Sequence, residues 1–251
     1  MAPTASSSSK VAVVTGGSRG LGRGIVQALA GRGLRVLALA RDEAALSAVA
    51  REIPSVTPLV GDATDEALAQ RVLTRDSPDL VVLCAGAMPV LGSLHEQTWD
   101  DFQTNWDVDA KSTFVWLRHA LRLPMKRGGH VVVISSGAAA QGSPVSGGYA
   151  SAKRAQWFMA DYAATESARA NLGLRIHCLL PSLNGSTALG RAGIEAYAKR
   201  AGVSPEEFAK RFDPPLSPEI MGRGVVEVFE SPDRFAQLAY RIGGGGLTAL
   251  A

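Results

Sequence analysis

Short apolar runs alternate along this chain with longer stretches of helical periodicity, and that alternation limits its fold more than any other feature. The runs, such as VAVVT at 11–15 and HVVVISS at 130–136, have no polar face, as in strands that are buried on both sides. Strands separated by helices of about 10–15 residues are joined by right-handed crossovers. The sequence therefore predicts an α/β fold with one doubly wound parallel sheet flanked by helices, whose ligands bind beyond the carboxyl ends of the strands.

The pattern also predicts the individual elements. Strands are expected at 11–15, 34–40, 57–60, 79–84, 130–136 and 174–180, with a possible last strand at 238–242. Helices are expected at 20–31, 41–51, 64–75, 98–123, 149–171, 190–201, 204–211 and 218–230. No linker or charge block interrupts the chain after residue 10, so we expect a flexible polar tail over 1–9 and a single domain over 10–251.

Composition excludes several classes of partner. The 26 Lys and Arg residues are scattered and nearly balanced by 23 Asp and Glu, which argues against nucleic acid or a membrane surface as a partner. No apolar run approaches the roughly 18 residues of a membrane span. Cys84 and Cys178 lie in apolar runs without the spacing of metal ligands. We expect buried, reduced thiols, no metal, and a cytoplasmic location.

A glycine-rich turn joins the first predicted strand to the first predicted helix. It reads Thr15-Gly16-Gly17-Ser18-Arg19-Gly20-Leu21-Gly22. Glycine lets backbone N–H groups approach a ligand closely, and the start of a helix favours an anion. The turn therefore predicts a site for the pyrophosphate of a nucleotide.

The spacing Thr-Gly-x-x-x-Gly-x-Gly resembles the fingerprint of the short-chain dehydrogenase/reductase family. The resemblance implies a Rossmann-type fold and a nicotinamide cofactor. Asp62 matches the family's adenine-contacting aspartate, although it could instead cap the helix expected from 64. Leu83-Cys84-Ala85-Gly86 takes the place of the family's Asn-Asn-Ala-Gly turn, with both asparagines replaced. The positions expected at the cofactor are Gly16, Ser18, Arg19, Gly20, Leu21, Gly22, Arg41, Asp62, Ala63, Ala85, Gly86, Tyr149, Lys153, Pro181 and Leu183.

Charge at the end of the second predicted strand indicates which cofactor binds. An NAD site places an acid there to accept a hydrogen bond from the ribose 2′-hydroxyl. This chain has Ala40 followed by Arg41, with Arg19 in the glycine-rich turn. Two guanidinium groups suit a 2′-phosphate, so NADP(H) is expected. Asp42 is the complication, and we interpret it as the cap of the following helix.

Ser136, Tyr149 and Lys153 form the strongest catalytic pattern. Tyr149 and Lys153 are four residues apart on one predicted helix and so share a face, and Ser136 follows the fifth strand. A lysine ammonium near a phenol stabilises phenolate, and we expect it to lower the pKa of Tyr149 by up to about three units before burial opposes it. Tyr149 would then pass a proton to a carbonyl oxygen as hydride arrives, with Ser136 bonded to the same oxygen. The resemblance implies the same roles.

A fourth family position is altered. Counting from Ser136 and Phe114 places the family's helix asparagine, which holds a water linked to the lysine, at Asp109. Asp109 could carry the proton relay or could pair with a nearby cation. Asn105 is close by but out of register.

The segment 183–217 is long for a connection and rich in apolar residues, which is typical of a substrate lid. The small-residue loop 137–148 would form the opposite wall, with Gln141 and Val145 as contacts. We expect four tryptophans to pack rather than to stack on a ligand; they are Trp99, Trp106, Trp116 and Trp157. An apolar lid favours a carbonyl substrate of medium size with hydrophobic substituents.

Three functions remain open. The first is an NADP-dependent ketone, carbonyl or oxoacyl reductase acting on a small molecule. The alternatives are an NAD-dependent alcohol dehydrogenase and a non-catalytic NADP-binding sensor or scaffold. The resemblance also implies a homo-tetramer or homo-dimer built through the helices expected at 98–123 and 149–171.

Overall fold

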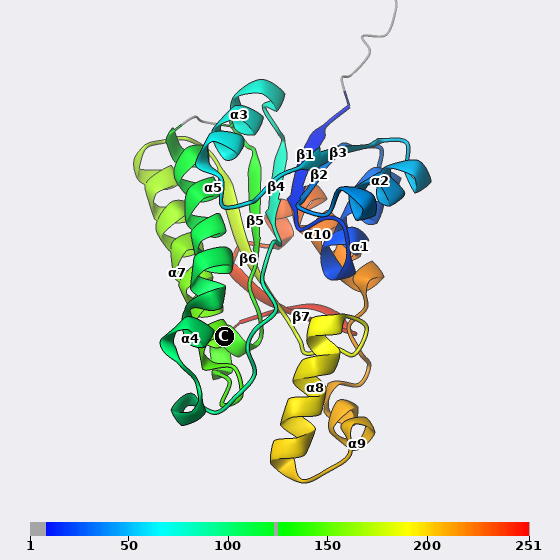
Figure 1. Cartoon of the computed structure of the whole chain (residues 1–251). Coiled ribbons are helices and arrows are strands. Elements are labelled where there is room, and N and C mark those ends of the chain that lie inside the picture. Colours follow the sequence, from blue (N-terminus) through cyan, green and yellow to red (C-terminus); the bar gives the residue numbers. More distant parts are fainter. Residues whose placement is uncertain (1–8, 123–124, 251) are drawn as a thin grey trace, which may run out of the picture.

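One eight-stranded sheet forms the centre of the protein in the computed structural model, which describes residues 9–122 and 125–250 (Figure 1). The strands are β1 (Val11–Thr15), β2 (Arg35–Ala40), β3 (Val56–Val60), β4 (Leu80–Leu83), β5 (His130–Ile134), β6 (Arg175–Pro181), β7 (Ala239–Gly243) and β8 (Gly246–Ala249). Their spatial order is β3-β2-β1-β4-β5-β6-β7-β8, and β1 to β7 are parallel. The predicted doubly wound α/β fold is confirmed.

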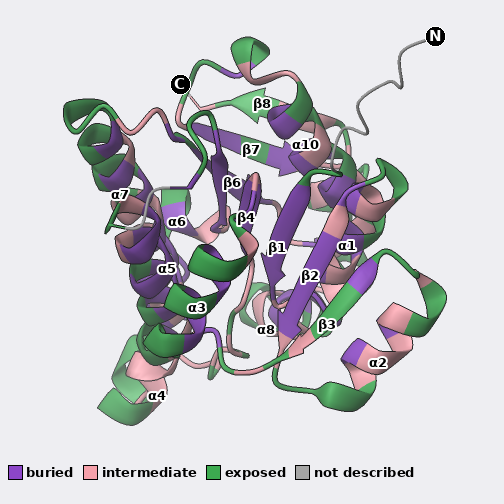
Figure 2. Ribbon diagram, turned by 90° about the horizontal axis from the view of Figure 1, so that it is seen from above, coloured by how far each residue is buried: buried purple, intermediate pink, exposed green. Residues whose placement is uncertain are grey.

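Helices cover both faces of this sheet (Figures 1 and 2). The main helices are α1 (Gly20–Gly31), α2 (Glu43–Glu52), α3 (Glu66–Asp76), α4 (Trp99–Asn105), α5 (Lys111–Arg122), α7 (Gly147–Arg169) and α10 (Pro218–Glu230). Residues of α3, α5 and α7 pack with Val11 and Val13 on one face, and residues of α1, α2 and α10 pack with Ala12 and Val14 on the other. Alternate residues of β1 thus enter two separate cores, which explains why its sequence is apolar throughout.

The strand order reverses between β1 and β4, and ligands of such sheets bind at this point. Two helices, α8 (Ala188–Ala201) and α9 (Pro205–Ala209), project beyond the carboxyl ends of the strands (Figure 1). They have a small core of their own around Ile194, Ala198 and Phe208. The segment expected to be a lid is therefore a packed unit beside the switch point.

Several elements differ from expectation. The helix expected at 98–123 is divided by a π-helical turn, η2 (Trp106–Ala110), and its residue 123 lies outside the described residues. The loop 137–148 contains a short helix, α6 (Ala138–Gln141), because Ala138 to Ala140 are good helix formers. An antiparallel strand, β8, was not expected at all. The tail expected at 1–9 lies, apart from Ser9, outside the described residues.

The tryptophans that were expected to pack differ in their burial. Trp116 is buried, whereas Trp99 is 68% exposed and Trp106 is 41% exposed. None of the helices in the described part of the chain combines the length and the hydrophobicity needed to cross a bilayer.

Candidate active site

A cavity of about 1850 Å³ opens at the carboxyl ends of the strands. Its lining includes every residue expected at the cofactor and all four expected catalytic residues, Ser136, Tyr149, Lys153 and Asp109. These residues come from positions 16 to 183 of the chain, so the parallel topology is what brings them together. Gln141 also lines the cavity, but Val145 does not, because its side chain is buried in the protein.

The glycine-rich turn forms a cradle that side chains would fill. Gly16 has φ +72°, and a Cβ atom on Gly22 would lie 2.2 Å from the Gly16 carbonyl oxygen. The first turn of α1 has no acidic residue, and Arg19 at its N-cap makes no side-chain capping bond. The amide groups at this helix start are therefore available to an anion, and the turn fits the pyrophosphate of a dinucleotide.

The Thr15 hydroxyl joins this turn to the end of β4. It accepts hydrogen bonds from the backbone N–H groups of Cys84 (3.0 Å) and Ala85 (3.1 Å) and donates to the Val82 carbonyl (3.4 Å). Cys84 is half-buried, and burial raises the pKa of its thiol to about 11. A protonated thiol at this place supports packing rather than chemistry.

The end of β2 presents positive charge to the cavity. Arg19 and Arg41 are exposed, line the cavity and form no ion pair within the described residues. Asp42 also lines the cavity, but its carboxylate caps α2, where it accepts a hydrogen bond from the Ala45 N–H at 2.9 Å. The cap interpretation of Asp42 is confirmed.

Asp62 is held by its own turn and not as a helix cap. It accepts hydrogen bonds from the Thr64 N–H (2.8 Å) and the Thr64 hydroxyl (2.9 Å). The bond from the Thr64 N–H holds the pKa of Asp62 below its usual value. Partial burial of the carboxylate opposes this effect, and the positive charge of Arg41 adds to it. Asp65 caps α3 instead, so the alternative role considered for Asp62 is wrong.

Tyr149 and Lys153 lie in the first turns of α7 and face the cavity together with Ser136, which follows β5. The Lys153 ammonium lies 5.6 Å from the centroid of the Tyr149 ring. Ser136 accepts a hydrogen bond from the Ala138 N–H at 3.2 Å, which fixes its oxygen at the start of α6. The Ser135 hydroxyl donates to the Lys153 carbonyl at 2.7 Å and so ties α7 to β5.

The expected lowering of the Tyr149 pKa is wrong for this structure. Burial raises the pKa of Tyr149 above its usual value, and it outweighs the opposing effects of the Lys153 ammonium and the Ser136 hydroxyl. The phenol therefore carries its proton at neutral pH, as a proton donor must.

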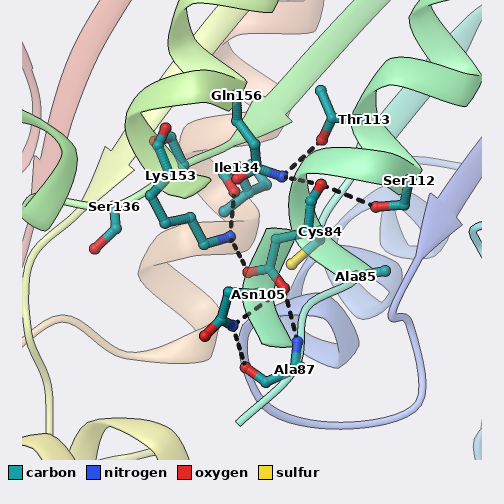
Figure 3. Close-up of polar contacts among 12 residues, drawn as sticks. Cys84, Ala85, Ala87, Asn105, Ser112, Thr113, Ile134, Ser136, Lys153 and Gln156 are labelled. Atoms are coloured by element: carbon teal, nitrogen blue, oxygen red, sulfur yellow. Dashed lines mark hydrogen bonds and ion pairs between the residues drawn. The ribbon is translucent and has the colours of Figure 1, made fainter. Parts of the chain in front are cut away.

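Asp109 pairs directly with Lys153. Its side chain is fully buried in the π-helical turn, and its Oδ2 lies 3.3 Å from Lys153 Nζ without a hydrogen bond of its own (Figure 3). Its Oδ1 accepts from the Ala87 N–H (2.8 Å) and from Asn105 Nδ2 (3.3 Å). Lys153 Nζ also donates to the Ile134 carbonyl at 3.2 Å. Burial is the largest single effect and would lower the pKa of Lys153, but the interactions with Asp109, Tyr149 and Cys84 together outweigh it and raise the pKa of Lys153.

Sequence reasoning missed three supporting residues. Asn105 is buried and donates to the Ala87 carbonyl (3.0 Å) as well as to Asp109. The Trp116 indole donates to the Ala63 carbonyl (3.0 Å) and supports the loop next to Asp62. Gln156 donates to the Asp109 carbonyl (2.9 Å). The spacing of Asn105, four residues before Asp109, was the one available signal, since residues four apart share a helix face.

Comparison with known proteins agrees with this geometry. The family model for short chain dehydrogenases matches residues 10–195. A short-chain type dehydrogenase/reductase of Sinorhizobium fredii, y4eK, is 31% identical over 80% of this chain and 83% of its own. The L-fucose dehydrogenase of Mus musculus is 32% identical over 72% of this chain and 67% of its own. The solved structure of NAD+-bound xylitol dehydrogenase superposes with a TM-score of 0.82 at 20% identity, covering 94% of this chain and 98% of that one.

The family model and the curated relative agree with the glycine-rich turn and with the serine, tyrosine and lysine around one cavity. The chain belongs to the short-chain dehydrogenase/reductase family.

Proposed function

We propose that this oxidoreductase uses NADPH to reduce a ketone or another carbonyl compound to an alcohol. One observation carries the proposal. Ser136, Tyr149 and Lys153 line the same cavity, and Tyr149 is a protonated phenol beside an ammonium group. This is the arrangement that a proton donor to a carbonyl oxygen requires.

The residues present fit NADPH. The turn 16–22 would hold the pyrophosphate, Asp62 and Ala63 would flank the adenine, and Arg19 and Arg41 would bind the 2′-phosphate. Ala40 at the end of β2 offers no carboxylate to a 2′-hydroxyl, and Asp42 is engaged in its cap. When bound, the cofactor supplies the hydride.

The protein's own groups handle the proton. Tyr149 donates its hydroxyl proton to the carbonyl oxygen while the carbonyl carbon accepts the hydride, and an alcohol results. Ser136 donates a hydrogen bond to the same oxygen and stabilises its developing negative charge. The Lys153 ammonium stabilises the phenolate that remains on Tyr149.

Asp109 acts on this chemistry through Lys153. A buried ammonium without a counterion would lose its proton readily, and the adjacent carboxylate prevents this. Because Oδ1 is fixed by Ala87 and Asn105, Oδ2 stays directed at Lys153. Of the two roles considered for Asp109, we favour pairing with the cation, which makes it a positioning residue.

Oxidation of NADPH in the presence of ketones, aldehydes and oxoacyl thioesters tests the proposal, with Tyr149→Phe as the matched variant. We expect turnover with at least one class, and a loss of about 10²–10⁴-fold in kcat in Tyr149→Phe with little change in NADPH affinity. Full activity of Tyr149→Phe would contradict the mechanism. Tight NADPH binding without turnover of any class would favour the sensor function instead.

An NAD-dependent alcohol dehydrogenase is the second candidate. The xylitol dehydrogenase neighbour is NAD+-bound, and the mouse relative is named for the oxidation of L-fucose. Titration of both reduced cofactors separates the candidates, since tighter binding of NADH than NADPH at low salt would favour the second.

A further inference from the structure

The lid end of the cavity carries positive charge that no acid neutralises. Three arginines of the segment 183–217 line the cavity, Arg191, Arg200 and Arg211, and β7 adds Arg241. The acidic residues of the same segment do not line it; they are Glu195, Glu206, Glu207 and Asp213. Three of the five basic residues of the lid thus line the cavity, whereas none of its four acidic residues does.

Arg211 is held in place by a stack of aromatic rings. Its guanidinium lies 4.7 Å from the centroid of the Phe208 ring. The Tyr197 ring stacks on Phe208 at 5.6 Å with an interplanar angle of 4°. Phe208 is buried, so this stack is part of the small core of the lid. A guanidinium fixed over an aromatic ring keeps its N–H donors free in the plane for a ligand.

The same stack reaches the catalytic helix. The Tyr197 hydroxyl bonds to the Ser143 hydroxyl across the cavity, and Ser143 lies 2.6 Å from the Ser146 hydroxyl. Ser146 is the N-cap of α7, which carries Tyr149 three residues later. These contacts connect Arg211, through the Phe208 and Tyr197 rings, to the start of the helix that carries Tyr149.

The donors at this end are unused. Arg200, Arg211 and Arg241 make no ion pair or side-chain hydrogen bond with any residue in 9–122 or 125–250. Arg191 differs, because it donates to the Gly185 carbonyl (3.3 Å) and follows Thr187, which lies beside Gly20 of the glycine-rich turn. We therefore place Arg191 at the cofactor end of the cavity. Arg200 and Arg211 are the lid arginines whose donors have no partner among the described residues.

We propose that the carbonyl substrate carries an anionic group, a carboxylate or a phosphate, at the end remote from its carbonyl, and that Arg200 and Arg211 bind this group. The proposal rests on the proposed function and narrows its substrate class. It narrows the expected carbonyl substrate with hydrophobic substituents to an amphiphilic one, with an apolar middle along the Tyr197 and Phe208 rings and a charged end at the arginines.

Matched substrate pairs test the proposal. An oxo acid and its methyl ester differ in charge and by one methyl group, and an oxo alkyl phosphate distinguishes phosphate from carboxylate. We expect a KM for the acid about tenfold below that of the ester, a preference that weakens at high salt. Arg211→Met and Arg200→Met should each raise the KM of the anion, together by about tenfold or more, with kcat and the KM of the ester unchanged. Lys210→Met removes a neighbouring charge that does not line the cavity and should change neither.

Binding without turnover separates this proposal from the proposed function. Calorimetric titration with hexanoate and with methyl hexanoate measures recognition of the charge alone. Binding of hexanoate that the double variant Arg200→Met/Arg211→Met loses supports the anion site even if no carbonyl is reduced. Equal affinity for the two compounds, or equal effects of the arginine variants on acid and ester, would overturn it.

Discussion

At the scale of single residues, the direct pair of Asp109 and Lys153 sets this protein apart from the pattern that its sequence resembles. The Asp109 side chain is fully buried and that of Lys153 nearly so, and each would be costly to bury alone. Removing one partner therefore affects the other, and the charge of Asp109 also acts on Tyr149.

We expect Asp109→Asn to move the alkaline limb of the pH profile for reduction to lower pH. Reduction needs a protonated Tyr149, so kcat/KM falls as the pH rises through the pKa of that phenol. The Asp109 carboxylate contributes to raising this pKa, so its removal lowers the pKa of Tyr149 as long as Lys153 keeps its proton. The asparagine oxygen can still accept a hydrogen bond from Lys153, so activity at lower pH should persist.

Asp107→Asn is the control for this variant, because Asp107 lies exposed in the same π-helical turn. Its pH profile should match that of the unchanged protein. The tyrosinate absorbance of Asp109→Asn, with Asp109→Asn/Tyr149→Phe as blank, measures the same shift without turnover. A profile that falls in height but does not move would leave Asp109 a purely structural role.

Cofactor choice is also decided by single side chains. We expect Arg41→Ala to raise the KM for NADPH by about tenfold or more and to leave the KM for NADH nearly unchanged, because the lost interaction is with the 2′-phosphate alone. Steady-state kinetics with both cofactors measures this, and Arg51→Ala, at the far end of α2, is the control. An equal rise for both cofactors would contradict the assignment.

At the scale of elements, the adjacent strands β5 and β6 each carry a buried histidine. His130 and His177 have ring centroids 6.1 Å apart, and neither Nδ1 has a partner within the described residues. Burial, with smaller effects from His177, Arg175 and Lys10, lowers the pKa of His130 to about 4. Both rings are therefore neutral in the folded protein.

This pair predicts a loss of stability in acid. The unfolded chain binds a proton at position 130 below about pH 6.5, whereas the folded protein does so only near pH 4. The free energy of unfolding should thus be highest above pH 6.5 and fall by up to about 3 kcal/mol as the pH drops towards 4. Urea unfolding across this range measures it. His130→Phe should flatten the dependence and exposed His95→Gln should not; an unaltered slope in His130→Phe would refute the explanation.

The sequence predicted elements well where a single local pattern decides the structure. β1 and β2 are nearly continuous apolar runs because both of their faces are buried. β8 was missed because it starts within a run of glycines, Gly243 to Gly246, that also forms the turn from β7. No hydrophobic run in the sequence marks this turn or the pairing of β8 with β7. The π-helical turn was missed for a similar reason, since one extra residue in a helix hardly changes its apolar stripe.

At the scale of the whole molecule, topology explains why the residues expected at the site line one cavity. All parallel strands end at one edge, so residues that follow different strands must meet there. The lid followed no such rule. The positions of its arginines and the bond from Tyr197 to Ser143 depend on how α8 and α9 pack. The sequence of these two helices does not indicate which of their faces turns toward the cavity.

One face of the molecule exposes aromatic side chains over α4, η2, α5 and α7; they are Trp99, Trp106, Phe114, Phe158 and Tyr162. Phe158 and Tyr162 stack on each other, and Arg154 lies over Phe158 at 4.6 Å. These are the helices through which the sequence predicts assembly, so we expect a second copy of the chain to cover this face.

The double variant Phe114→Asp/Phe158→Asp should shift a homo-oligomer to monomers. It replaces two rings, 53% and 45% exposed in the single chain, by carboxylates that would lose their hydration in the interface. Analytical ultracentrifugation measures the mass. Val60→Asp, which alters an equally exposed apolar residue on the opposite edge strand β3, should leave the mass unchanged. A monomer before any substitution would disprove the assembly.

The hydroxyl of Thr15 has a consequence for the thermodynamics of ligand capture. By linking the end of β1 to the main chain at the end of β4, across the strand-order reversal, it fixes the separation between the two segments that a dinucleotide must span. A receptor with this separation set in advance gives up little conformational entropy when it is filled. Thr15→Val would keep the shape but release that link, so its penalty should appear mainly as a less favourable binding entropy.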